Sequence, residues 1–426
     1  MKKVLFLLIL ISIGCKKSTK EFTSTSDEKI AYLEKNRFDL NSSAFNFPQK
    51  DFKILGLGAY HGSAKIEDVE IKMLESLTKE GKIKYYFPEL DYSTAHFFNR
   101  YLKTGNEDLL KELVVSIGFY CEQERTIEVY EKWKNLKALY DKLPKEKRFK
   151  VVGLEWIQNY KNTSKYLLEL LDSSKVDFKP VEEIRDMVKK DTTHFALGDL
   201  SFAYSKMQNL VKDFKENKTV YQDNTSNPKI LNHLIKTIEE SFPKDQDREK
   251  MMFNNYVNLD KIYNFKENPQ FIRIGFFHLE KSREGEKSYP SFFARLIENK
   301  IYKKEEVISV IGYYTNSEVV WDELYENDTY KGFTIEAGFG IGDYEKEFFR
   351  GIQNLKNTKI SDKTLFRLNK NNSPYNSEPD LIEVIMPDKK SNGEKVKEMS
   401  TLDFMDYAIL ISNSKASKPI FEMDKK

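Results

Sequence analysis

ILGLGAYHG, residues 54–62, is the stretch from which the rest of the sequence can be organised. It begins as a short apolar run, contains two glycines, and then presents His61 followed by Gly62. A short apolar run bounded by turn residues is typical of a strand that is buried on both faces. The residues that follow, 64–81, carry apolar side chains at helical spacing and stop at Gly81. We therefore predict a strand, a turn that presents His61, and a helix.

The same alternation continues along the chain. Further strand-like segments lie at 83–90, 149–156, 270–277 and 306–314, and helix-like segments lie at 93–105, 122–143 and 291–300. Strands separated by helices indicate a parallel sheet with helices on its faces. A mostly helical stretch at about 160–265 is too long for a simple crossover, and short strand-like pieces follow residue 315. The prediction is an α/β domain over 49–315 with a mainly parallel central sheet flanked by helices, a helical insertion subdomain, and a C-terminal β-rich extension over 316–426. The extension either adds strands to the sheet or forms a small lobe of its own.

Composition limits the kinds of partner. The chain has 426 residues, 40% of them hydrophobic and 32% charged, which is typical of a globular protein. Lys and Arg total 69 and Asp and Glu total 67, so no excess of positive charge points to nucleic acid. We expect a small-molecule substrate or ligand and no nucleic-acid partner.

The first residues are those of an export signal. MKK precedes the apolar run VLFLLILISIG, which is too short to span a bilayer because a spanning helix needs about 20 residues. ISIGC resembles the lipobox of bacterial lipoproteins, in which the cysteine, here Cys15, becomes acylated. This predicts a signal peptide over 1–14, a lipidated Cys15 with a polar tether over 15–48, and a cell-envelope protein that is lipid-anchored to a bacterial membrane and faces away from the cytoplasm. A plain secretory signal remains the alternative.

Titratable residues stand at the carboxyl ends of four predicted strands. They are His61, Glu89, Glu155 and His278. Ligands of parallel α/β sheets bind outside the carboxyl ends of the strands, so these positions predict a site at that rim. Each of the two histidines on its own is also explained as a turn residue that is hydrogen-bonded to backbone. GLGAYH starts like a dinucleotide-binding fingerprint, but His61 replaces the third glycine.

Together these residues resemble the erythromycin esterase-like family of hydrolases. That family opens its fold with a G-E-x-x-H-G motif, which GLGAYHG matches at His61 and Gly62. The glutamate that ends the family's second strand corresponds to Glu89 in FPELD, and the acid that usually ends its third strand corresponds to Glu155 in VVGLE.

Two later motifs extend the resemblance. The family's R-D-x-x-M-A-x-N helix element matches REKMMFNN at Arg248, Met252 and Asn255. The family's H-N-x-H pair matches GFFHLEKS at its first histidine, His278. The resemblance spans roughly residues 50–315.

The resemblance implies a hydrolase that acts on an ester or lactone. His61 would activate water as a general base, which suits an imidazole because its pKa is about 6.5. Glu89 would fix the tautomer of His61, and His278 would be a second acid or base. The residues implied in oxyanion stabilisation or substrate binding are Arg248, Lys281, Glu155 and Asn255.

The sequence departs from the family at three positions. Gly58 replaces the motif glutamate, Lys281 replaces the second histidine of the pair, and Glu70 replaces an arginine. Two alternatives therefore stay open beside the hydrolase. One is a catalytically inactive surface binding lipoprotein, and the other is a metal-dependent hydrolase that uses the same histidines and carboxylates. No cofactor is expected, and metal remains an open possibility.

Overall fold

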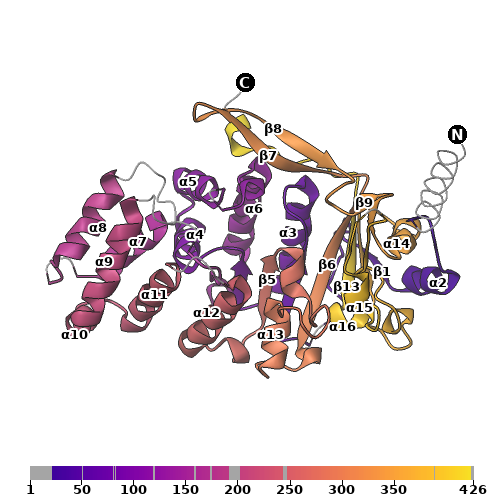
Figure 1. Ribbon diagram of the computed structural model, residues 1–426, viewed down its shortest axis with the longest axis horizontal. Coiled ribbons are helices and arrows are strands. Elements are labelled where there is room, and N and C mark those ends of the chain that lie inside the picture. The colour runs from indigo at the N-terminus through magenta and orange to yellow at the C-terminus, as the bar shows by residue number, and fades with distance from the viewer. Residues whose placement is uncertain are drawn as a thin grey trace, which may run out of the picture. The chain divides into compact units, whose positions relative to one another are not determined.

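The computed structural model describes residues 22–49, 51–79, 81, 83–118, 120–157, 160–172, 175–190, 202–242, 247–387 and 389–423. The chain divides into two compact units (Figure 1). The first unit contains Met1–Glu80 and Ile274–Lys426, and the second unit contains Gly81–Arg273. Each unit is described by itself below.

The first unit is built on a mixed sheet with a parallel centre. Its strands run in the order β1-β11-β13-β6-β2. They are β1 (Arg37–Asp39), β11 (Lys363–Arg367), β13 (Tyr407–Ser412), β6 (Val307–Thr315) and β2 (Ile54–Gly58). β6 pairs in parallel with both β2 and β13, and the other two pairings are antiparallel. All residues of β2, β6 and β13 are buried, which explains their continuous apolar sequences.

Helices surround this sheet. α3 (Ala64–Lys79) follows β2 and buries the apolar positions predicted from its periodicity: Ile66, Val69, Met73, Leu74 and Leu77. The other helices of the first unit are α2 (Asp27–Lys35), α13 (Phe292–Glu298), α14 (Ile352–Thr358), α15 (Gly393–Val396) and α16 (Thr401–Phe404). Short 3₁₀ helices are η4 (Phe276–Leu279), η5 (Lys304–Glu306), η6 (Pro374–Asn376) and η7 (Ile420–Glu422).

Part of the range 15–48, which was predicted to be a polar tether, is folded. α2 and β1 lie inside that range, and Lys29 on α2 donates to Glu378 at 2.8 Å and to Asp380 at 2.7 Å. These charged contacts to distant residues could not be recognised from a polar local sequence. Cys15 and the predicted signal peptide lie outside the described residues. No helix in the described part of the chain is both long and apolar enough to cross a membrane.

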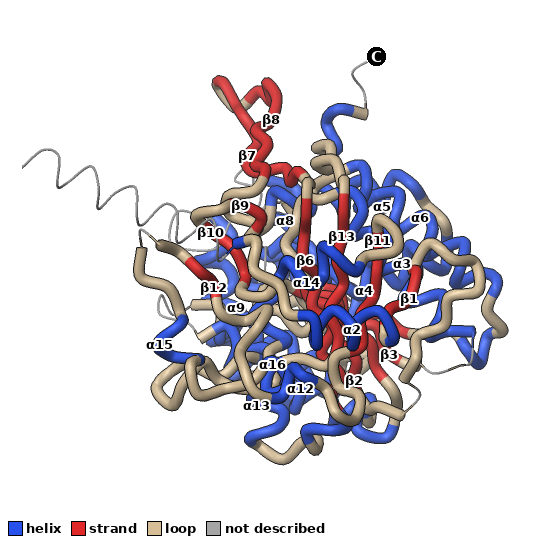
Figure 2. Tube along the Cα trace, turned by 90° about the vertical axis from the view of Figure 1, so that its right-hand side faces the viewer, coloured by secondary structure: helices blue, strands red, loops and turns tan. Residues whose placement is uncertain are grey.

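The C-terminal extension both adds strands to the large sheet and forms small sheets of its own. β11 and β13 join the sheet, whereas two small antiparallel sheets form apart from it. One is a hairpin of β7 (Glu318–Glu326) and β8 (Thr329–Ala337) that projects beyond the ends of β6 and β13 (Figure 2). The other contains β9 (Asp343–Tyr344), β10 (Glu347–Phe349) and β12 (Val384–Ile385).

The second unit has a parallel sheet in the order β5-β3-β4. Its strands are β3 (Tyr85–Pro88), β4 (Lys150–Val151) and β5 (Gln270–Ile274). β4 is much shorter than the predicted strand at 149–156. A Cβ on Gly153 would stand 2.1 Å from the backbone oxygen of Asp91, so the chain approaches β3's end too closely to continue as a regular strand. After β4, a single parallel β-bridge pairs the backbone of Asp91 with that of Glu155.

Most of the second unit is helical. Its helices are α4 (Tyr92–Thr104), α5 (Glu107–Ile117), α6 (Ile127–Lys142), α7 (Tyr160–Leu170), α8 (Lys179–Lys190), α9 (Phe202–Glu216), α10 (Lys218–Asp223), α11 (Pro228–Glu240) and α12 (Arg248–Tyr263), with 3₁₀ helices η1 (Glu122–Glu124), η2 (Lys145–Lys147) and η3 (Phe265–Glu267). The predicted helical insertion corresponds to α7–α12. α7–α11 share a hydrophobic core that includes Leu167, Met207 and Leu231, each 0% exposed. The predicted α/β class, mainly parallel strands flanked by helices, helical insertion and β-rich C-terminal extension are confirmed.

Candidate functional site

Two predicted histidines converge in the first unit. His61 follows the end of β2, and His278 lies on η4. A Cβ built on Gly275 would stand 3.7 Å from Nε2 of His61 and 3.6 Å from Nε2 of His278. Both side chains are only partly buried. The two imidazoles therefore face one small region that solvent can reach.

Local backbone geometry presents His61 at this place. Gly62 has φ of +84°, a conformation that favours glycine, and a Cβ there would stand 2.7 Å from the backbone oxygen of Val320. The backbone N–H of Val320 in turn donates to the oxygen of Gly62 at 2.9 Å. The glycine after His61 is thus required by the turn that ends β2.

Gly58 leaves no space for the glutamate of the resembled family. A Cβ on Gly58 would stand 3.1 Å from Leu279, 3.2 Å from the Cα of Phe276 and 3.3 Å from Ile311. These are contacts with backbone and packed side chains, so a longer side chain cannot enter without displacing η4. The departure at position 58 is therefore built into the packing of the first unit.

Aromatic side chains flank the histidine pair. Tyr60 stacks on Phe276 with ring centroids 6.1 Å apart, and Phe276 meets Tyr313 edge-on at 5.7 Å. Burial, and then the charge of Glu347, raises the pKa of Tyr60 to about 12. Burial also raises the pKa of Tyr313 well above 10, with further contributions from Glu280 and Tyr60. Both hydroxyl groups are therefore protonated at neutral pH. Tyr60 was not predicted as a site residue, although its position directly before His61 is a signal that could have suggested it.

Lys281 forms a buried ion pair inside the first unit. Its Nζ donates to both carboxylate oxygens of Asp406, at 2.9 and 2.8 Å, and the Lys281 side chain is 3% exposed. Asp406 also accepts from the backbone N–H of Ser309 at 2.9 Å. Lys281 therefore joins the chain after η4 to the start of β13, and its ammonium group is engaged in that structural contact.

A second set of predicted residues comes together in the second unit. Arg248, the first residue of α12, donates to Glu155 through Nε at 2.9 Å and through Nη2 at 2.8 Å. Nη2 also pairs with Glu89. Bidentate guanidinium–carboxylate pairs of this kind are among the strong charge-assisted hydrogen bonds. We call these three residues the Arg248 cluster.

The carboxylates of the Arg248 cluster stabilise the charged form of Arg248. Burial opposes ionisation of Arg248, but Glu155 and then Glu89 outweigh it and raise the pKa of the guanidinium. The ring of Tyr120 lies 5.2 Å from the guanidinium carbon, and its own pKa is raised by burial and by Glu155. Glu155 is almost fully buried, with a side chain that is 1% exposed. One guanidinium thus pairs with two carboxylates, from the end of β3 and from the chain after β4.

Asn255 and Asp91 position backbone beside the Arg248 cluster. Asn255 lies two turns after Arg248 on α12, and its Nδ2 donates to the backbone oxygens of Leu154 at 2.9 Å and of Glu155 at 3.3 Å. Asp91 caps α4 by accepting from the backbone N–H of Thr94 at 2.9 Å and from its hydroxyl at 2.8 Å. Asp91 therefore has the structural role of an N-cap.

The predicted residues therefore form two groups. His61 and His278 meet in the first unit, whereas Glu89, Glu155, Arg248 and Asn255 meet in the second. In the part of the chain that the structure describes, no group of three or more His, Cys, Asp or Glu side chains is placed to hold a metal ion.

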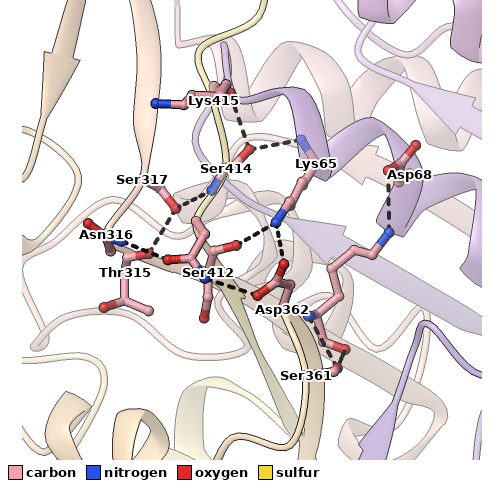
Figure 3. Close-up of polar contacts among 12 residues, drawn as sticks. Lys65, Asp68, Thr315, Asn316, Ser317, Ser361, Asp362, Ser412, Ser414 and Lys415 are labelled. Carbon is pink, nitrogen blue, oxygen red and sulfur yellow. Dashed lines mark hydrogen bonds and ion pairs between the residues drawn. The ribbon is translucent and has the colours of Figure 1, made fainter.

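A polar network in the first unit had no sequence signal (Figure 3). Lys65, at the start of α3, points to Asp362 at 2.7 Å and to the backbone oxygen of Ser412 at 2.8 Å. The hydroxyls of Ser63 and Ser414 lie 2.7 Å apart, and Ser414 also accepts from the N–H of Lys65 at 3.0 Å. These contacts fasten the start of α3 to the end of β13 and give the network a structural role.

The fold is similar to that of three solved proteins. The structure of a Bacillus cereus protein has a TM-score of 0.62 at 14% identity, covering 93% of this chain and 99% of that one. A succinoglycan biosynthesis protein has a TM-score of 0.60 at 13% identity with the same coverage. A mutant of the erythromycin esterase EreC in its open conformation has a TM-score of 0.54 at 11% identity, covering 86% of this chain and 92% of that one. No protein-family model and no curated protein matches the sequence. The likeness supports a distant erythromycin esterase-like fold.

Proposed function

We propose that the protein hydrolyses an ester or lactone and that His61 and His278 carry the chemistry. The supporting observation is their convergence, since both Nε2 atoms lie within 4 Å of the point where a Cβ on Gly275 would stand. Paired imidazoles suit general acid–base catalysis because imidazole exchanges protons near neutral pH. Similarity of fold to an erythromycin esterase supports an ester or lactone as the substrate class.

The proposed reaction needs only water as second reactant. His61 removes a proton from water as the water oxygen attacks the carbonyl carbon. The tetrahedral intermediate then loses its leaving oxygen, and His278 supplies the proton that this oxygen needs. The products are a carboxylic acid and an alcohol, or one hydroxy acid from a lactone. The aromatic rings of Tyr60 and Phe276 give the site an apolar wall.

An ester-substrate screen of the purified full-length protein tests the proposed reaction. Simple aryl esters and macrocyclic lactones are supplied, and the released acid is measured at constant pH. We expect His61→Ala and His278→Ala each to lower kcat by about 100-fold or more, because general acid–base groups contribute about 10²–10⁴. Tyr289→Ala is the control, since that side chain is 84% exposed. Equal rates in the wild type and both histidine variants would remove the pair from the mechanism.

A ligand-binding protein without catalysis is the second candidate. Two features favour it: Lys281 is buried in an ion pair with Asp406, and Gly58 has no space for an acid. In this case the screen yields no turnover with any ester, and His61→Ala changes only the affinity for a bound ligand.

Lipid anchoring in the cell envelope is proposed from the lipobox-like ISIGC. We propose that Cys15 is acylated and holds the protein on a bacterial membrane, facing away from the cytoplasm. Several buried acyl chains suffice, at about 0.8 kcal/mol per CH₂. Cys15→Ser should abolish incorporation of labelled palmitate and move the protein from the membrane to the soluble fraction. Unchanged labelling would reject Cys15 as the site.

A further inference from the structure

A cavity in the second unit lies away from the residues assigned above. It has a volume of about 680 Å³ and is lined by α4, the connection from α6 to β4, and α7. Its lining residues are Tyr92, His96, Asn99, Arg100, Lys103, Thr104, Tyr140, Lys145, Arg148, Phe149, Lys150, Val151 and Tyr166. Cavities that hold small molecules commonly measure about 300–1,000 Å³, so this one has a suitable size.

One face of α4 forms a wall of the cavity. Tyr92, His96, Asn99 and Lys103 recur at helical spacing on that face. Asn99 fixes the wall to strand β4, because its Nδ2 donates to the backbone oxygen of Val151 at 2.7 Å and its Oδ1 accepts from the N–H of Val151 at 3.0 Å. The wall is therefore held by hydrogen bonds to the sheet.

Five cationic side chains line the cavity, and none of the lining residues is a carboxylate. Arg100 pairs with Glu169, which lies outside the lining. No carboxylate within 4 Å of Lys103, Lys145 or Lys150 is found among the described residues. Like charges gathered in a cleft raise the local concentration of anions. The cavity therefore favours a ligand with more than one negative charge.

Aromatic rings share the cavity with these cations. Arg148 lies 4.8 Å from the ring centre of Tyr140, and its Nε donates to the backbone oxygen of Leu143 at 3.2 Å. His96 stacks on Tyr166 with ring centres 3.7 Å apart. Burial lowers the pKa of His96, although Glu169 opposes this, so the stacked imidazole is neutral at pH 7. The site thus offers flat apolar surfaces beside positive charge.

We propose that this cavity binds a phosphate ester of nucleotide size that carries a planar ring. Lys and Arg are the usual partners of phosphate oxygens, and aromatic rings stack on planar rings. Lys103, Lys145 and Lys150 are exposed lining residues that are able to reach a phosphate, whereas Phe149 and Tyr166 are buried lining residues that supply apolar surface. The inference does not depend on the proposed hydrolase.

Calorimetric titration of the full-length protein tests it. The probes are adenosine 5′-monophosphate and adenosine 5′-diphosphate, with adenosine lacking the phosphate and inorganic phosphate lacking the ring. We expect the two nucleotides to bind about tenfold or more tightly than either fragment, and the binding to weaken as salt rises. Absence of nucleotide binding, or equal binding of nucleotide and fragment, overturns the proposal.

Variants locate the binding. Lys145→Gln changes an exposed side chain, and Arg148→Gln removes a stacked guanidinium; each should weaken nucleotide binding by about tenfold. Lys142→Gln is the matched control, because Lys142 is an exposed lysine at the end of α6 that does not line the cavity. Circular dichroism confirms that each variant is folded. Unchanged affinity in Lys145→Gln and Arg148→Gln, or an equal loss in Lys142→Gln, overturns the assignment to this cavity.

Discussion

Lys281 and Asp406 form a buried ion pair in which Nζ lies 2.9 Å from one carboxylate oxygen and 2.8 Å from the other. The resembled family places the second histidine of its pair at position 281. In this protein the position joins two parts of the first unit, so the chemistry proposed for the site depends on two imidazoles and not three.

Breaking that ion pair should destabilise the protein. Lys281→Met leaves the Asp406 carboxylate, 9% exposed, without its cation, and Asp406→Leu leaves the ammonium without its anion. We expect each to lower the free energy of unfolding by about 3–5 kcal/mol, measured by urea denaturation. The double variant should recover most of that loss. A double variant as unstable as the sum of both singles would show that the pair is not an isolated unit.

A methyl group at position 275 should impair catalysis more than folding. Its carbon would stand 3.3 Å from Cδ2 of His278, close enough to displace the imidazole. Gly275→Ala is therefore expected to lower kcat for ester hydrolysis by about tenfold while the melting temperature changes little. Gly332→Ala is the control, because no atom lies within 4 Å of a Cβ at that position. Full activity in Gly275→Ala would contradict the placement of the pair.

Restoring the family glutamate should not create a better enzyme. Gly58→Glu puts a side chain against Leu279 and the backbone of Phe276. We expect this overpacking to lower the free energy of unfolding by about 1–3 kcal/mol. We also expect turnover to fall, because the displaced η4 carries His278. A stable and more active Gly58→Glu variant, by thermal melting and the ester assay, would show that η4 moves aside.

Removing Arg248 should make stability depend on pH. Because Glu155 and Glu89 raise the pKa of Arg248, its contribution is fully present below the ordinary pKa of arginine and is constant over pH 6–9 in the wild type. In Arg248→Met the buried Glu155 carboxylate loses the bidentate guanidinium, which should cost about 3–5 kcal/mol at pH 7. The deficit should shrink as the pH falls and the carboxyl group is protonated. Urea denaturation at pH 7 and pH 5 checks this, and a deficit that grows on acidification would refute it.

His233 should contribute to acid sensitivity. Burial lowers its pKa to about 3, with a smaller effect of Lys236, and its ring meets Tyr92 edge-on at 4.9 Å. Histidine in the unfolded chain has a pKa of about 6.5, so below that pH the unfolded chain binds a proton that the folded protein does not. The free energy of unfolding therefore falls by up to about 1.4 kcal/mol for each unit by which the pH is lowered. His233→Phe should show a flatter decline between pH 6.5 and pH 4. Parallel declines in both proteins would contradict the assignment.

Strands and helices with a local signal could be predicted from the sequence. β2, β6 and α3 were predicted because each is made of contiguous or periodic apolar residues that become buried. β4 was predicted too long, because its end is set by the approach of Gly153 to Asp91, which is not visible in the local pattern. α5 was not predicted at all, although Asn106 caps it through its side chain.

The candidate site was predictable only in part. His61 and His278 could be found because each follows a strand, and Arg248 and Asn255 could be found because REKMMFNN resembles a family motif. The role of Lys281 could not, since its partner Asp406 is 125 residues away. Pairs of that kind depend on tertiary packing, which one sequence without its fold does not display.

The order of the two units along the chain has a consequence during synthesis. The first unit consists of two segments separated by the whole second unit, and β2 finds its parallel neighbour β6 only after residue 307 has been made. As the ribosome works from the amino end, residues 81–273 can fold while β2 and α3 still wait with their apolar faces uncovered. The nascent chain therefore passes through a long interval in which chaperone protection of residues 54–79 is most needed.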